Sequence, residues 1–589
     1  MSYFVADDKL PVLQQQVAIP SENGLSYNST QTIELNIPAG TKFINPKNCY
    51  LQFNVKLSND ETAGYGRLRT MLDGTIGAQS LIKDIRIYDG NKNQLLEEYL
   101  DYNVMVAMKY DYETNDSIKN KRALLEGALI DNQPDTRGSR GSTKSQQNMI
   151  INNPYFINDE EATQDTDFSN SANMCDIKVC LPLHTGIFQN EAIFPTMLTN
   201  GLHLSITLEE DRKVFRMLDG CALLRRSTLN PIFFSTNAST SGSVTNGSDI
   251  KEFYTYNANS QNGAENSPFV PGQFINFYSN EDTSASFTIS GSTTKGYPQI
   301  ASIETDGGLC KYTLTASLTN ATGETLTTDG KWIVIDETID KLTGPFNATY
   351  KVSNVEMILE QIQADSRYES GMMAKMNEGG VITYDFLSCT NYKYSQLVSD
   401  RVANIRLPLN NARMKSIISV PTDSTVYDLK TAMTGGKADF TGTETYQVAP
   451  DYNRDYYSYS DRSGLVGVSD NISNYSWFYD GRLQPSRRVD LSKTSSKTSI
   501  SAQGLIELDK ALTAAGINTH SMAKYSENFC IGRAVAIGKN NVYDARNKDF
   551  NLQVNYQETD APTKPHLWHN FVYHIRRMNI QGQNISIEV

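Results

Sequence analysis

The stretch from Leu72 to Tyr112 changes its hydrophobic period three times, and it constrains the fold more than any other part of the chain. Between Ser80 and Tyr88 apolar and polar residues alternate, which predicts a strand with one exposed face, and the following Asp-Gly-Asn predicts a turn. Beyond the turn, apolar residues recur at three- and four-residue spacing, which predicts a short amphipathic helix. These residues are Leu95, Leu96, Tyr99, Leu100, Val104 and Met108.

Length and composition favour several β-rich domains. A chain of 589 residues is too long for one compact core, so we expect at least two domains. Its 32 Tyr and 22 Phe far outnumber its 3 Trp, and aromatic residues of this kind suit strands. With 53 basic and 66 acidic residues the net charge is −13, which opposes a broad electrostatic footprint on nucleic acid. We therefore expect no sequence-specific nucleic acid binding.

The cysteine pattern and the hydropathy indicate the kind of compartment in which the protein is expected. The 7 Cys are odd in number and scattered, so we expect reduced thiols in an intracellular assembly compartment. The start MSYFVADDKLPVLQQQ lacks the pattern of a signal peptide. No segment approaches the roughly twenty apolar residues that span a bilayer. These observations predict a soluble protein.

The alternation of apolar and polar residues continues through the first half of the chain. Predicted strands cover Gln31 to Pro38, Cys49 to Leu57, Met174 to Leu183, Leu202 to Leu208 and Val352 to Ile362. Residues 113–172 are rich in Asn, Asp, Ser and Gly and predict a long surface excursion.

Changes in composition suggest the domain boundaries. We expect an N-terminal arm over residues 1–30 and a first β domain over 31–365, with a β-rich surface insertion at about 236–347. A linker over 366–380 then leads to a second β domain over 381–589. The insertion is rich in Ser, Thr, Gly and Asn.

The second half contains a stretch that repeats the order of elements seen in the first. Tyr475 to Leu491 predicts a hydrophobic strand, an Asp-Gly turn and an extended segment, and Ile500 to Ala515 predicts a helix. The two halves share no residue-by-residue identity, so a structural duplication is inferred from element order alone.

Three segments carry a resemblance to a known family. They are Gly77 to Tyr102 with its Gly-Ala-x-Ser-Leu-Ile turn, the segment GLHLSITLEEDRKVF, and Asp480 to Leu491 followed by its helix. Together they resemble double jelly-roll major capsid proteins of the polinton-like virus and virophage type, in the adenovirus hexon-like lineage. The resemblance implies an all-β fold of two consecutive eight-stranded jelly-roll barrels, with long loop insertions and short helices.

The same resemblance implies a structural function. Proteins of this family form pseudo-hexagonal homotrimeric capsomers that tile an icosahedral shell around a double-stranded DNA genome. The implied partners are the chain itself, neighbouring capsomers, penton proteins and minor capsid proteins. The implied location is the virion, after assembly inside the infected host cell. The resemblance implies no enzymatic activity and no cofactor.

Residues with the chemistry of active or metal sites are present, but their patterns favour structural roles. His566, His569 and His574 gather in HLWHNFVYH, where two of them could approach a metal, yet a third ligand is missing from the pattern. Cys175 and Cys180 would point to opposite faces of one strand, which disfavours a metal or disulfide pair. We therefore predict no catalytic, cofactor or metal site.

Acidic runs leave a second reading of the function open. Glu97-Glu98, Asp159-Glu160-Glu161 and Glu209-Glu210-Asp211 could supply paired carboxylates for glycoside hydrolysis, although a solvated face is the favoured interpretation. The alternatives to a capsid protein are thus a carbohydrate-active β-sandwich enzyme and an adhesin or fibre-type β protein. A tight trimer inert toward glycans would favour the shell, and an active monomer the enzyme.

The predicted N-terminal arm is the candidate assembly segment. Its aliphatic residues lack a core-forming period but could bury a strip against a neighbouring subunit. These residues are Val12, Leu13, Val17, Ile19 and Leu25.

Overall fold

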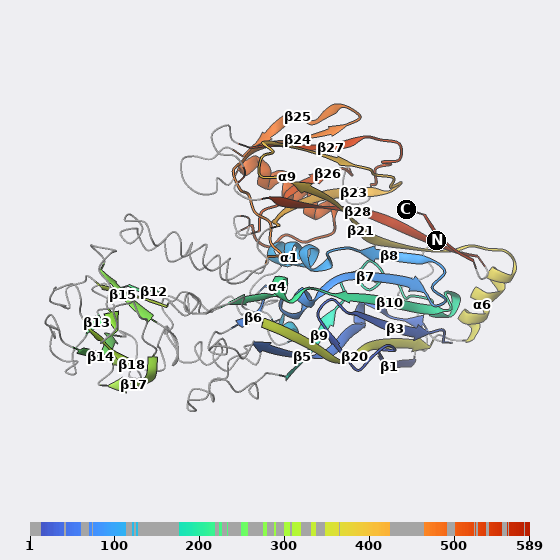
Figure 1. Ribbon diagram of the computed structural model, residues 1–589. Coiled ribbons are helices and arrows are strands. Elements are labelled where there is room, and N and C mark those ends of the chain that lie inside the picture. The colour runs from blue at the N-terminus through green and yellow to red at the C-terminus, as the bar shows by residue number, and fades with distance from the viewer. Residues whose placement is uncertain are drawn as a thin grey trace.

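Each half of the chain forms a pair of sheets with four main strands each in the computed structural model (Figure 1). The structure describes residues 13–59, 70–113, 121–127, 176–217, 348–424, 464–491 and 501–588, together with the strands within 223–336, apart from shorter gaps. The first eight are β1 (Leu13–Pro20), β3 (Thr32–Pro38), β5 (Tyr50–Asn59), β7 (Ile82–Asp89), β8 (Leu95–Tyr99), β9 (Asp176–Pro182), β10 (Gly201–Leu208) and β20 (Ala348–Gln363). The second eight are β21 (Ile382–Gln396), β22 (Val402–Leu407), β23 (Met414–Asp423), β24 (Ile472–Tyr479), β25 (Arg482–Asp490), β26 (Ile531–Ala534), β27 (Phe550–Tyr556) and β28 (His566–Gln581).

The two halves connect their strands in the same order. The first half has sheets β1-β20-β5-β9 and β3-β10-β7-β8, and the second has β21-β28-β23-β26 and β22-β27-β24-β25. Numbered along the chain from one to eight, both halves follow the orders 1-8-3-6 and 2-7-4-5. This is the connectivity of a jelly roll, which packs two sheets over one core. The predicted all-β double jelly roll is therefore confirmed.

Helices also occupy equivalent places in the two jelly rolls. Helix α1 (Tyr102–Glu113) follows the fifth strand of the first, and α9 (Ala502–Ala514) follows the fifth strand of the second. The Ser501 side chain caps α9 by accepting a hydrogen bond from the Gly504 backbone N–H at 3.3 Å. The duplication that was inferred from element order is thus present in the strands and in the helices.

The predicted helix over Leu95 to Met108 is wrong in its first half. Leu95–Tyr99 is strand β8, which pairs with β7 after the turn, and the helix begins only at Tyr102. Leu95 to Tyr99 carries apolar residues at spacings compatible with either period, and the neighbouring strand decides between them. Asp101, with φ 51°, separates the strand from the helix.

The predicted N-terminal arm enters the first jelly roll. β1 pairs with β20 over its whole length, from Leu13 opposite Gln363 to Pro20 opposite Glu356, and the short strand β2 (Ser26–Asn28) also pairs with β20. From Leu13 onward the segment is therefore part of a sheet rather than a separate arm, which corrects the expected boundary. Its three consecutive Gln residues hide the strand period, and the long partner β20 supplies the backbone hydrogen bonds.

Smaller elements complete the two jelly rolls. Strands β4 (Phe43–Ile44) and β29 (Asn584–Glu588) extend the sheets at β20 and β28, and β6 (Thr70–Leu72) pairs with β11 (Phe215–Met217). Further helices of the described residues include α4 (Asp211–Val214), α6 (Ser366–Asn377) and the 3-10 turns Pro46–Asn48, Gly77–Leu81 and Thr196–Leu198. α6 lies within the expected linker and joins the two jelly rolls.

The connection between β10 and β20 contains two small sheets of its own. They are built from β12 (Leu223–Arg225), β13 (Ile232–Phe233), β14 (Asp249–Tyr256), β15 (Ile275–Ser279), β16 (Thr288–Ile289), β17 (Ile300–Asp306), β18 (Leu309–Thr319) and β19 (Trp332–Asp336). β12 and β13 precede the expected start of the insertion at 236, yet they pair with β19 and β14.

The two ends of the molecule differ. Connections two to three, four to five and six to seven of a jelly roll lie at one end, and the others lie at the opposite end, because successive strands run in opposite directions. The insertion strands extend from one end, at the left of Figure 1, whereas α6 and both chain termini lie toward the other.

One continuous hydrophobic core runs through both jelly rolls. On β10, Leu202, Leu204, Ile206 and Leu208 point inward and are buried, as their alternation predicts. Buried residues of the second half, such as Trp477 and Trp568, belong to the same cluster. The two jelly rolls are therefore packed against each other.

Candidate functional site

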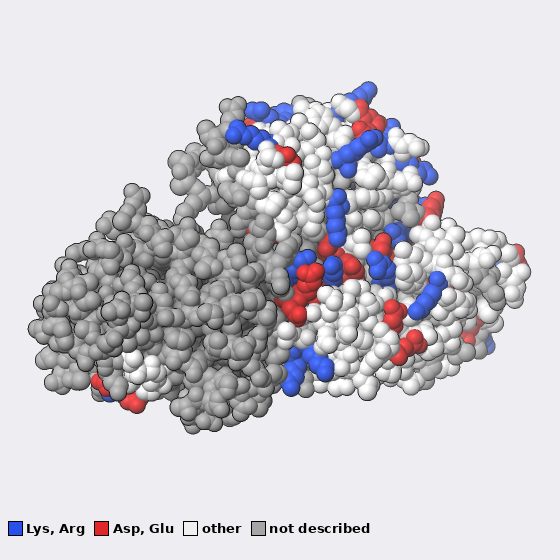
Figure 2. Space-filling view, viewed as in Figure 1, with Lys and Arg blue, Asp and Glu red and all other residues white. Residues whose placement is uncertain are grey.

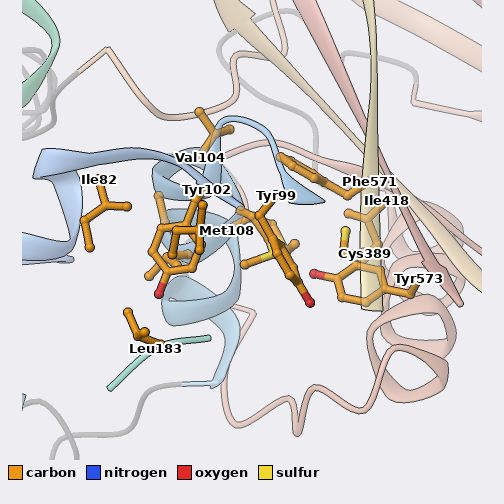
Figure 3. Close-up of a cluster of buried hydrophobic side chains, with 14 of the residues drawn as sticks. Ile82, Tyr99, Tyr102, Val104, Met108, Leu183, Cys389, Ile418, Phe571 and Tyr573 are labelled. Atoms are coloured by element: carbon orange, nitrogen blue, oxygen red, sulfur yellow. The ribbon is translucent and has the colours of Figure 1, made fainter. Parts of the chain in front are cut away.

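The surface that joins the two jelly rolls contains several buried polar and charged side chains. Strand β8 of the first jelly roll contacts β21 of the second, so an edge of one sheet meets an edge of another. Figure 3 shows side chains of both halves meeting around Tyr99, with Phe571 and Tyr573 on one side and Tyr102 and Met108 on the other. We call this surface the seam.

Asp101, just after β8, is the centre of a buried charge network in the seam. Its carboxylate forms an ion pair with Lys393 of β21 and lies 3.5 Å from Nδ1 of His569 in β28. Asn391 donates to the same carboxylate at 3.1 Å. Burial raises the pKa of Asp101, but the hydrogen bonds and charges of His569 and Lys393 outweigh it and hold that pKa well below its usual range. The network stabilises one relative position of the two jelly rolls.

Glu97 of β8 is a second buried carboxylate in the seam. It accepts hydrogen bonds from the backbone N–H groups of Gly186 at 3.0 Å and of Ile187 at 2.8 Å. Burial raises the pKa of Glu97, while the Ile187 hydrogen bond and the charge of Arg576 oppose that shift. Arg576 of β28 also donates to the Leu96 carbonyl at 2.7 Å, so the second jelly roll caps the backbone of β8.

The carboxyl end of α1 docks into the second jelly roll. Asn528 donates from its amide to Asp111 at 2.6 Å, and its side-chain oxygen accepts from the backbone N–H of Gly467 at 2.7 Å. The Tyr112 hydroxyl donates to the Asn528 carbonyl at 2.9 Å, and the Tyr112 carbonyl accepts from the His520 N–H at 2.9 Å. The bond from His520 satisfies a backbone carbonyl that the helix end leaves unpaired, and the side-chain bonds attach the helix to the second jelly roll.

Close backbone approach fixes the opposite end of the seam. A Cβ atom on Gly186 would lie 2.3 Å from the Leu387 carbonyl oxygen and 2.6 Å from Glu97 Oε1, so only glycine fits. Nearby, the Tyr384 hydroxyl donates to the Ala192 carbonyl at 3.0 Å. The seam is thus held by backbone contacts at one end and by the α1 contacts at the other.

A separate cluster of buried ionisable groups surrounds Tyr110 in α1. The Tyr110 hydroxyl donates to Glu126 at 2.9 Å and lies 2.6 Å from Nε2 of His184, whose Nδ1 is 3.2 Å from Lys109 Nζ. The Arg122 guanidinium lies 3.3 Å from the centroid of the Tyr110 ring. Burial raises the pKa of Glu126 to about 7 and lowers the pKa values of His184 and Lys109.

The structure describes the side chains of three of the five sequence-predicted assembly residues, namely Val17, Ile19 and Leu25. Val12 lies outside the described residues, and Leu13 begins β1. Val17 and Ile19 are partly buried on β1, and Ile19 packs against the core. Leu25 is 84% exposed. Whether these residues act in assembly remains a prediction.

Where the structure describes them, the histidines considered as metal ligands form hydrogen bonds and ion pairs within the fold. His569 belongs to the Asp101 network, His566 contacts Tyr556 and Asp470, and His574 contacts the Val572 carbonyl. Within the described part of the chain, no group of three or more His, Cys, Asp and Glu could hold a metal ion. Cys175 lies outside it.

The candidate carboxylate pairs are likewise split. Glu98 pairs with Arg86 at 2.8 Å, whereas Glu97 is buried in the seam. Buried Glu209 accepts a hydrogen bond from the Asn103 amide at 2.9 Å. Residues 159–161 lie outside the described residues. The carboxylates of Glu97, Glu98 and Glu209 therefore each have separate partners within the fold.

Sequence reasoning missed the seam residues. Asp101, Asn391 and Lys393 lie far apart in the chain, and their pairing depends on how the jelly rolls meet. In the sequence, Asp101 lies inside the predicted helix over Leu95 to Met108, so no local pattern distinguished it. In the described residues, no helix is long and apolar enough to cross a membrane.

Solved structures are similar to this protein over nearly the whole chain. No family model matches the sequence, and no curated protein matches it. A structure of PBCV-1 VP54, fitted into a cryo-EM reconstruction of the virophage Sputnik, is similar over 100% of this chain and 99% of that chain, with 10% identity and a TM-score of 0.46. The Faustovirus major capsid protein is similar over 98% and 92%, with 9% identity and a TM-score of 0.42.

The mavirus major capsid protein is also similar, over 98% of this chain and 90% of that chain, with 10% identity and a TM-score of 0.32. The double jelly roll itself is defined by the strand order of the two halves.

Proposed function

We propose that the chain is a viral major capsid protein that forms homotrimeric, pseudo-hexagonal capsomers. The observation that carries the proposal is the seam: two jelly rolls of identical strand order are held side by side by buried charges, hydrogen bonds and a shared core. An assembly unit that tiles a surface needs this fixed geometry, because an error in the angle between barrels would accumulate over the shell.

Symmetry explains why two barrels in one chain are useful. Three copies around a three-fold axis place six similar barrels in a ring, which approximates a hexagon. Hexagonal capsomers can tile the faces of an icosahedral shell, here proposed to enclose a double-stranded DNA genome. Pentons and minor capsid proteins would complete the shell.

The two ends of the molecule suit the two sides of a shell. The insertion strands extend from one end, which we assign to the outside of the virion, since loops tolerate variation and carry recognition. The chain termini and α6 lie toward the other end, which would face the base of the capsomer, where it can contact minor proteins. Assembly would take place inside the infected host cell.

The test is the mass and shape of the purified protein. We expect light scattering to give three times the mass of the 65.7 kDa chain. Negative-stain images should show particles with a hexagonal outline and a three-fold crown. A monomer at micromolar concentration, unchanged between low and high salt, would contradict the proposal. Activity of that monomer on glycans would favour the carbohydrate-active alternative.

A further inference from the structure

Each jelly roll has one edge at its first strand and another at its fifth strand. The seam covers one edge of each kind, so each chain leaves one edge of each kind uncovered. Within the chain, the fifth strand of the first jelly roll, β8, meets the first strand of the second, β21. The equivalent strands left over are β25, which is the fifth strand of the second jelly roll, and β1, which is the first strand of the first. Figure 1 shows β25 and β1 at opposite extremes of the stacked barrels, with β8 and β21 between them.

We propose that β25 of one copy packs against β1 and the adjacent face of β20 in the next copy, so that the joint between chains repeats the seam within the chain. This inference rests on the proposed function, because a contact between unlike surfaces must be closed into a ring to leave no free ends. It goes beyond that function by naming the strands and charges of the contact. The occupant of each open surface is a second copy of this chain.

The charges of the open surfaces are complementary. β25 exposes Arg482, Arg487 and Arg488 with a single acid, Asp490, and Figure 2 shows basic side chains at the top of the second jelly roll, where β25 lies. β1 carries no charged residue. Its neighbour β20 places Glu356 and Glu360 opposite Pro20 and Gln16 of β1, both partly exposed.

In this contact, acidic and basic residues are distributed between the two jelly rolls in the opposite way to the seam. There the first jelly roll contributes the acids Glu97 and Asp101, and the second contributes the bases Lys393 and Arg576. Between chains, the basic side would come from the second jelly roll and the acidic side from the first. This reversed arrangement disfavours binding of an open β25 surface to β21, because basic residues would then face basic residues.

The exposed backbone of β1 supports the same assignment. β1 is an edge strand with β20 on one side, and no described strand pairs with its other side. Gln14, Gln16 and Ala18 are exposed along it, and before the terminal Pro20 the strand contains no Lys, Glu or Pro that would block pairing. An edge without such protection is a site where another chain can add.

The test combines cysteine crosslinking with mass measurement. Ala18→Cys on β1 and Arg488→Cys on β25 replace exposed residues, so both variants should fold. We expect the double variant to give covalent trimers on a non-reducing gel after mild oxidation. A mixture of the two single variants should give covalent dimers, whereas each single variant alone should resemble the parent chain.

Charge reversal provides an independent readout. Arg487→Glu combined with Arg488→Glu should weaken trimer association by about tenfold or more at low salt. The control is Arg406→Glu in β22, an exposed arginine on the opposite edge of the same sheet, which should leave association unchanged.

The outcomes separate this inference from the proposed function. Trimers by mass that neither crosslink in the double variant nor respond to charge reversal would overturn the β25 to β1 contact and leave the capsomer intact. Covalent dimers from a single variant would show contact between like surfaces and would also overturn it. Absence of trimers from the parent chain would overturn both.

Discussion

Asp101 shows how one side chain can serve both the backbone and the packing of domains. Its φ of 51° lies in the left-handed region, which Asp and Asn tolerate better than other residues with side chains. The same residue places a carboxylate against Lys393 and His569 of the second jelly roll. Substituting Asn therefore removes the charge while keeping the backbone preference.

We expect Asp101→Asn to lower the free energy of unfolding by roughly 2 kcal/mol near neutral pH, because two buried charge-assisted contacts are lost. Since the folded state depresses the Asp101 pKa, this stabilisation is present above the unfolded pKa of about 4 and is lost as the pH falls below it. Chemical denaturation at pH 7 and at pH 3 measures both effects.

The matched control is Asp385→Asn, which breaks a surface ion pair with Arg577. That change should cost less than about 1 kcal/mol. Equal effects of the two substitutions would show that the Asp101 network contributes no more than a surface pair.

Glu126 should also make the free energy of unfolding depend on pH, but in the opposite direction to Asp101. Its pKa of about 7 is above the unfolded value, so the folded state holds the proton more tightly and stability falls as the pH rises from about 4.5 to 7. Glu126→Gln keeps an acceptor for the Tyr110 hydroxyl and removes the buried charge. We expect it to raise the free energy of unfolding by about 1 to 3 kcal/mol at pH 8, with little change at pH 5.

Denaturation curves at four pH values between 5 and 8 would check this. The control Glu98→Gln, on the partly exposed pair with Arg86, should keep the pH trend of the parent chain. A gain at pH 5 as large as that at pH 8 would assign the effect to packing rather than to charge.

At the scale of elements, the start of β1 sets how many N-terminal residues can be removed without loss of stability. Deleting residues 2–12 leaves every described strand intact, so we expect the melting temperature not to change. Deleting residues 2–20 removes β1 and exposes the edge of β20, and it also removes the partly buried Val17 and Ile19. We expect this longer deletion to cost a few kcal/mol, at about 1.5 to 3 kcal/mol for each fully buried aliphatic side chain. Thermal melts of both truncations would show the difference, and equal melting temperatures would mean that β1 contributes nothing.

The insertion has boundaries that follow strand pairing. Replacing residues 223–336 with a Gly/Ser linker removes both small sheets completely, so both jelly rolls should stay folded with an unchanged circular dichroism melt. Replacing residues 236–347 instead leaves β12 and β13 without their partners β19 and β14. We expect this second variant to be less soluble, because it exposes unpaired strands. Loss of soluble protein from both variants would mean that the insertion is needed for the jelly rolls to fold.

At the scale of the whole molecule, the seam should hold the two jelly rolls together without a covalent link. A protease site inserted at Gly379 lies at an exposed turn after α6 where no atom crowds the glycine. After cleavage we expect both halves to elute together in size-exclusion chromatography and to unfold in one transition. The same nicked chain with Asp101→Asn should separate at a lower denaturant concentration. Separation of the parent halves in buffer would show that the covalent link is what holds them together.

Much of this protein is determined by local sequence. Alternating residues in β10 and β3, the Asp-Gly turn before β25 and the helical stripe of α9 specify their elements through backbone periodicity and turn chemistry alone. The repeated order of strand, turn and helix also indicates the duplication. These features depend on neighbours a few residues away, so they can be recognised without knowing the fold.

Tertiary structure decided the rest. Leu95–Tyr99 becomes a strand because β7 offers hydrogen bonds, and Leu13–Pro20 joins a sheet because β20 has a free edge. Asp101 meets Lys393 only when two jelly rolls pack in one orientation. Partners so far apart in the chain leave no local pattern, since their contact free energy arises only after both barrels have formed.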